Sequence, residues 1–103
     1  MKEKVPVMKH IFILNPAAGK SDQTPRFTQD IERICGARGL DYEICVSKAP
    51  GDCRALARRA AESGQEVRLY ACGGDGTLNE VVCGIAGFEN AAVTHYPGGS
   101  GND

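Results

Sequence analysis

The chain has 103 residues, enough for one small domain, and its 13 glycines and five prolines favour many turns and loops. Twelve basic and thirteen acidic residues give a formal net charge of −1, without the basic run typical of a nucleic-acid surface, so we expect no nucleic-acid partner. No apolar run reaches the ~18 residues that cross a bilayer. Five cysteines without a Cys-x-x-Cys pair favour free thiols and a cytoplasmic location.

Strand-like and helix-like patterns alternate along the chain. Four short apolar runs predict β-strands over Met8–Leu14, Asp41–Val46, Glu66–Cys72 and Ala91–Tyr96. Three amphipathic patterns between them predict helices from near Thr24 to Gly39, from Gly51 to Ser63 and from Thr77 to about Ala86. The order βαβαβαβ requires crossover connections, which join parallel strands. We therefore predict one α/β domain over residues 1–103, with a parallel sheet of about four strands and helices on its faces.

Apolar residues at helical spacing predict the side of each helix that faces the sheet. They are Phe27, Ile31, Ile34 and Cys35 in the first helix, Leu56, Ala57, Ala60 and Ala61 in the second, and Leu78, Val81, Val82 and Ile85 in the third. Pro25 suits a first helical turn, and Gly39 and Gly64 suit helix ends. His10 and His95 flank strands without a partner Ser or Cys at a recognisable spacing, so we predict structural roles for both.

The most informative segment is Gly73-Gly74-Asp75-Gly76-Thr77, which follows the third predicted strand. Its three glycines allow backbone torsions closed to other residues and let N–H groups approach a ligand closely. The run Thr77-Leu78-Asn79-Glu80 has the spacing of a capping box, with Thr77 at the N-cap and Glu80 reaching back. The N-terminus of the third helix then faces the loop, and this arrangement predicts a phosphate-binding site.

Asp75 is an acidic residue inside this predicted phosphate loop. Its carboxylate would repel a phosphate unless a cation lay between them, so we predict that Asp75 binds Mg²⁺ directly or through water. The alternative is an aspartate that satisfies backbone donors in a tight turn.

Two further loops of small residues also follow predicted strands. The segment Pro97–Asp103 has three glycines that permit close approach, and Ser100 supplies a hydroxyl for a phosphate oxygen. The segment Asn15–Lys20 ends in a lysine that would neutralise phosphate, but it lacks the first glycine of a Walker A loop. Parallel strands bring all three loops to one edge of the sheet, where open α/β folds bind their ligands. The sequence therefore predicts a nucleotide site.

At these loops the chain resembles the catalytic domain of the diacylglycerol kinase family, which includes sphingosine, ceramide and bacterial lipid kinases. The matching motifs are Asn15-Pro16-x-x-Gly19, the stretch from Gly73 to Val81, and Pro97-x-Gly99-Ser100-x-Asn102-Asp103. The Gly-Gly-Asp-Gly-Thr string alone is shared with NAD kinases and phosphofructokinases, whose nucleotide-binding domains have the predicted kind of fold. The two flanking motifs favour the lipid kinases.

The resemblance implies that ATP and Mg²⁺ bind here and that the γ-phosphoryl group passes to a lipid hydroxyl, such as that of diacylglycerol, at a membrane surface. The implied phosphate-binding residues are Gly73, Gly74, Asp75, Gly76 and Thr77, with Mg²⁺ near Asp75. By the same resemblance, Asn15 lies in the nucleotide site, and Ser47 matches a threonine that lines the nucleotide pocket. Ser100 stands where the family often has threonine.

The family pattern continues beyond the length of this chain, with a second, β-rich domain that supplies the general base. We therefore expect residues 1–103 to be the N-terminal nucleotide-binding part of a lipid kinase, without an assigned catalytic residue and inactive by itself. A sheet without further cover also predicts a homo-oligomer. Two alternatives stay open: an NAD kinase-like phosphotransferase with a soluble substrate, and a non-catalytic nucleotide-binding module.

Overall fold

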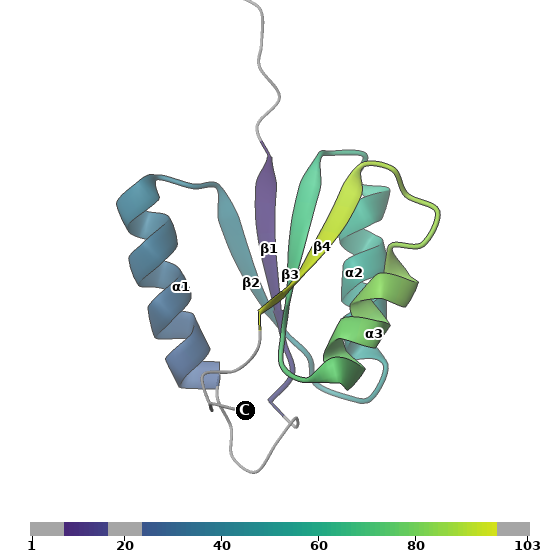
Figure 1. The fold of residues 1–103 in the computed structure, drawn as a ribbon, viewed down its shortest axis with the longest axis horizontal. Coiled ribbons are helices and arrows are strands. Elements are labelled where there is room, and N and C mark those ends of the chain that lie inside the picture. Colours follow the sequence, from purple (N-terminus) through teal and green to yellow (C-terminus); the bar gives the residue numbers. More distant parts are fainter. Residues whose placement is uncertain (1–7, 17–23, 97–103) are drawn as a thin grey trace, which may run out of the picture.

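The computed structural model describes residues 8–16 and 24–96, in which strands and helices alternate as the sequence predicts (Figure 1). The strands are β1 (Lys9–Leu14), β2 (Tyr42–Val46), β3 (Val67–Cys72) and β4 (Ala91–Tyr96). The helices are α1 (Thr24–Arg38), α2 (Asp52–Glu62) and α3 (Asp75–Gly84). The predicted α/β class and the βαβαβαβ order are confirmed. Within the described part of the chain, no helix is long and apolar enough to span a membrane.

The sheet has the strand order β2-β1-β3-β4, and all of its pairings are parallel. Leu14 at the end of β1 lies level with Val46 of β2 and Cys72 of β3, and Cys72 lies level with Tyr96 of β4. The four strands therefore end together at one edge of the sheet. The residues that follow each strand are brought to this edge.

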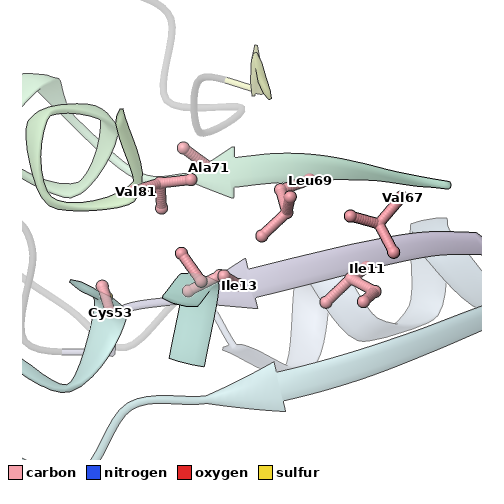
Figure 2. Close-up of a cluster of buried hydrophobic side chains, with 8 residues drawn as sticks. Ile11, Ile13, Cys53, Val67, Leu69, Ala71 and Val81 are labelled. Atoms are coloured by element: carbon pink, nitrogen blue, oxygen red, sulfur yellow. The ribbon is translucent and has the colours of Figure 1, made fainter. Parts of the chain in front are cut away.

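Helices cover both faces of the sheet, with α1 on one face and α2 and α3 on the other (Figure 1). Alternate strand residues point to opposite faces, so β1 contributes to two cores. Ile11 and Ile13 pack under α2 and α3 with Cys53, Leu69 and Val81 (Figure 2). The core on the α1 side consists of Phe12, Leu14, Phe27, Ile31, Cys35 and Cys72.

Two residues predicted to face the sheet are exposed instead, because α1 and α3 each bury a narrower stripe than their apolar residues suggest. Ile34 is 41% exposed and Val82 is 44% exposed. Each is the sequence neighbour of a buried residue, Cys35 and Val81 respectively, and one residue is about 100° of helical rotation. The first turn of α2 adds a buried residue that the pattern missed, Cys53.

The cysteines behave as small apolar side chains, and all five are free thiols, as predicted. Cys35, Cys53 and Cys72 are buried. Burial raises the pKa of each of these thiols, and that of Cys72 reaches about 12. These three side chains therefore stay protonated and stabilise the core as uncharged groups at neutral pH.

Candidate functional site

The turn from β3 into α3 is built on a close contact between Gly73 and Thr77. Gly74 is the N-cap of α3 in extended conformation, and the helix begins at Asp75. A Cβ atom on Gly73 would lie 2.7 Å from Oγ1 and 3.2 Å from Cβ of Thr77. No real side chain tolerates the shorter of these distances, so the turn requires glycine at position 73.

The predicted capping box is wrong. Thr77 lies in the first turn of α3 rather than at its N-cap, which is Gly74, and no side chain in the described part of the protein caps the helix. The hydroxyl of Thr77 points into the protein, where the residue is only 2% exposed. Glu80 does not reach back to the N-cap, and its Oε1 atom is buried without a hydrogen-bond partner among the described residues. The helix begins two residues earlier because extended Gly74 can take the capping position without a side chain.

The start of α3 presents backbone donors to open space. The N–H groups of a first helical turn have no acceptor within the helix, and the helix dipole adds partial positive charge at this end. Among the described residues, no atom lies within 4 Å of a Cβ built on Gly74 or Gly76, and both glycines are exposed. An anion could therefore approach this turn closely, which is the geometry of a phosphate site.

Beside this turn, polar side chains from three different segments meet. Asn15, which follows β1, donates a hydrogen bond from Nδ2 to Oγ1 of Thr77 at 3.5 Å. Ser47, which follows β2, donates from Oγ to Oδ1 of Asn15 at 3.4 Å, and its N–H donates to the Leu14 carbonyl at 2.8 Å. Ser47 is 6% exposed. This network joins the ends of two strands to the first turn of α3.

The structure thus brings together seven of the predicted site residues: Asn15, Ser47, Gly73, Gly74, Asp75, Gly76 and Thr77. Ser100 and the rest of the segment 97–103 lie outside the described residues, as does Lys20. Of the three loops predicted to meet at the carboxyl edge of the sheet, the structure describes residues 15 and 16 of the first and all of the Gly73–Thr77 segment. Ser47, which follows β2, joins them at this edge.

Asp75 occupies the first position of α3, where a carboxylate interacts favourably with the helix dipole. Asp75 is exposed, and its side chain makes no hydrogen bond or ion pair with any described residue. The alternative, in which the carboxylate satisfies backbone donors of the turn, is therefore not supported by a contact among these residues. Within residues 8–16 and 24–96, no three His, Cys, Asp or Glu side chains cluster as metal ligands. Mg²⁺ keeps several waters and commonly uses one or two carboxylates together with substrate phosphates. A single carboxylate beside a phosphate turn fits that mode of binding.

Comparison with known proteins identifies the group to which this site belongs. Residues 9–103 match the family model of the diacylglycerol kinase catalytic domain. The chain belongs to this family. The expectation drawn from the three loop motifs is confirmed by a match over nearly the whole chain.

Individual members of the diacylglycerol kinase family align with the chain over a fraction of their own length. A diacylglycerol kinase of Staphylococcus saprophyticus is 36% identical over 92 residues, which are 88% of this chain and 30% of that protein. Sphingoid long chain base kinase 5 of Saccharomyces cerevisiae is 30% identical over 102 residues, 91% of this chain and 15% of that protein. The crystal structure of a diacylglycerol kinase from Bacillus anthracis strain Sterne superposes with a TM-score of 0.68 at 30% identity, covering 98% of this chain and 34% of that one.

Two contacts at this site of the diacylglycerol kinase fold were not anticipated from the sequence. Nε2 of His95 lies 2.8 Å from the carbonyl oxygen of Gly73. Burial raises the pKa of the Cys53 thiol, and the neighbouring Ser47 side chain lowers it in part. The alternation along β4 was the available signal for His95, because Ala91 and Val93 pack against the core under α2 and α3 and His95 shares their side of the strand.

Proposed function

We propose that the chain forms the ATP-binding part of a lipid kinase, in which the β3–α3 turn binds the phosphates of ATP. The observation that carries this proposal is the convergence of the Gly73-Gly74 turn, the open N-terminus of α3 and the Asn15–Ser47–Thr77 network at one sheet edge. Membership of a kinase family supports ATP as the nucleotide. The names of the relatives, a diacylglycerol kinase and a sphingoid base kinase, support a lipid hydroxyl as the acceptor class.

In this proposal the chain contributes positioning and charge rather than covalent chemistry, as phosphoryl transfer requires. Backbone N–H groups of the first turn of α3 bind phosphate oxygens, and the network around Thr77 holds that turn in place. Asp75 would hold Mg²⁺ together with the phosphates, and the bound ion would neutralise charge on the transferred group. We assign no general base within residues 1–103.

ATP binding is tested by calorimetry and thermal melting with Gly74→Val. MgATP should raise the melting temperature of the wild-type chain by mass action. Valine at position 74 should abolish both the heat of binding and the shift, because its side chain fills the open space that the phosphate needs. Gly36→Val is the matched control, since a Cβ there also meets nothing within 4 Å but lies in α1. Equal MgATP binding by wild type and Gly74→Val would contradict the site.

Lipid kinase activity is tested with the chain alone and with a chimera. Residues 1–103 supply no assigned base, so they should bind MgATP without phosphorylating diacylglycerol or sphingosine in mixed micelles. Joining them to the remainder of the Staphylococcus saprophyticus kinase should give lipid phosphorylation that Gly74→Val removes. A folded chimera that binds MgATP but phosphorylates no lipid would contradict the lipid kinase function and favour a nucleotide-binding module or a soluble acceptor.

A further inference from the structure

His95 contacts the backbone of the β3–α3 turn rather than another side chain. Its Nε2 atom lies 2.8 Å from the carbonyl oxygen of Gly73. A carbonyl oxygen only accepts hydrogen bonds, so this geometry assigns the hydrogen to Nε2 and makes the imidazole the donor. The residue is half-buried on β4, level with Ala71 of the neighbouring strand β3.

This hydrogen bond fixes the peptide group that joins Gly73 to Gly74. In a planar trans peptide the C=O and N–H bonds point in opposite directions. Because the carbonyl of Gly73 points towards His95, the N–H of Gly74 points in the opposite direction, away from His95. No described residue accepts a hydrogen bond from that N–H, and Gly74 is exposed. It is therefore available to a ligand.

The turn needs such a restraint because two adjacent glycines rotate more freely than any other pair of residues. The carbonyl of Gly74 is already held by the N–H of Leu78, at 3.1 Å within α3. The carbonyl of Gly73 has His95 as its described partner. Because both carbonyl oxygens accept a hydrogen bond, the Gly73–Gly74 peptide group is restrained to one orientation.

From these contacts we infer that His95 is a positioning residue, which orients the Gly73–Gly74 peptide so that its N–H faces a bound phosphate. This inference rests on the proposed function for the identity of the ligand. The hydrogen bond between His95 and the Gly73 carbonyl is present in the protein without nucleotide, so it can be measured separately from ATP binding.

The test compares two replacements of nearly equal size. His95→Gln keeps an N–H donor at about the position of Nε2, and His95→Leu removes the donor while keeping an apolar body. Thr94→Val is the control. It also removes one hydrogen bond, the 2.9 Å bond that Thr94 accepts from Arg68, but Thr94 lies on the face of β4 opposite to His95. We expect His95→Leu to weaken MgATP binding about 3- to 10-fold, the range of one net hydrogen bond. His95→Gln and Thr94→Val should stay within about twofold of wild type.

A second measurement separates this inference from the proposed function. In NMR spectra without nucleotide, the imidazole ¹⁵N shifts of His95 should report hydrogen on Nε2. The amide signal of Gly74 should move in His95→Leu and return towards its wild-type position in His95→Gln. If wild type binds no MgATP but these signals behave as stated, the proposed function fails and the hold on the turn stands. An unchanged Gly74 amide in His95→Leu, or equal MgATP affinities of the leucine and glutamine variants, would overturn the role of His95.

Discussion

Thr77 illustrates how far single residues of the site could be assigned from the sequence. The motif around Thr77 predicted its presence at the start of a helix, but it suggested that the hydroxyl caps that helix. Instead the hydroxyl accepts a hydrogen bond from Asn15, and the residue is buried. The carboxyl ends of parallel strands lie at one edge of a sheet, so the sequence pattern predicts which residues come together there. It cannot give the direction of a side chain, which depends on packing between distant segments.

The exposed carboxylate of Asp75 leads to a prediction about metal dependence. Asp75→Ala should weaken MgATP binding about tenfold, the size of one charge-assisted interaction. In EDTA the same variant should bind ATP as well as wild type or better, because a negative charge beside the phosphates has been removed. Calorimetric titrations with and without Mg²⁺ measure both effects.

Asp52 provides the control for this prediction. It is also an acidic residue in the first turn of a helix, α2, where it accepts a hydrogen bond from the Lys48 N–H at 2.7 Å. Asp52→Ala should leave the Mg²⁺ dependence unchanged. If Asp75→Ala lost the same affinity with and without Mg²⁺, the proposed metal role of Asp75 would be wrong.

At the scale of elements, α3 is held in place by close packing against α2. Gly84 ends α3, and a Cβ atom there would lie 2.8 Å from Cβ of Ala57 and would clash with the Arg54 carbonyl oxygen. Backbone atoms cannot yield as a flexible side chain does, so the two helices would have to separate. Since α3 carries the phosphate turn at its other end, this contact supports the position of the site.

We therefore predict that Gly84→Ala lowers the free energy of unfolding by about 1–3 kcal/mol, the usual cost of overpacking. Urea denaturation measures this quantity. Gly36→Ala in the middle of α1 is the opposite case, because a Cβ there lies more than 4 Å from other atoms of the described residues outside the helix backbone. It should raise the free energy of unfolding by up to about 1 kcal/mol. Gly84→Ala with wild-type stability would show that the α2–α3 contact is looser than described.

The elements themselves were largely predictable, and the exceptions have physical causes. Strands such as β3 and β4 are short apolar runs bounded by turn residues, so the hydrophobic pattern and the flanking turn residues predict the same strand boundaries. The start of α3 was misplaced by two residues because Gly74 and Asp75 are compatible with both a loop and a first helical turn. The alternation along β4 gives the side of the sheet on which His95 lies, but it does not give the contact with Gly73, which is 22 positions away in the chain.

At the scale of the whole molecule, the sheet is covered unequally. Of the described helices, α2 and α3 lie on one face and α1 lies on the other, where Tyr70 and Tyr96 are only half-buried. Among the described strands, β2 and β4 form the edges of the sheet. Unpaired edge strands offer hydrogen-bonding groups to a second copy of the chain.

We therefore predict concentration-dependent association of the 103-residue chain between micromolar and millimolar concentrations, measured by light scattering after size-exclusion chromatography. Ala92 is exposed on β4, and Ala92→Lys should shift the equilibrium towards monomer, because an edge lysine disfavours strand pairing. A monomer at all concentrations would contradict the proposed homo-oligomer.

The function proposed for this chain requires that the turn into α3 binds the phosphates of ATP. Titration of ¹⁵N-labelled chain with MgATP, followed by amide NMR, tests it at the atoms concerned. The largest shifts should occur at the amides of residues 74–77, with smaller ones near Asn15 and Ser47 and none at the amino ends of β1 and β3. Saturable binding whose shifts lie elsewhere and leave residues 74–77 unmoved would contradict the account.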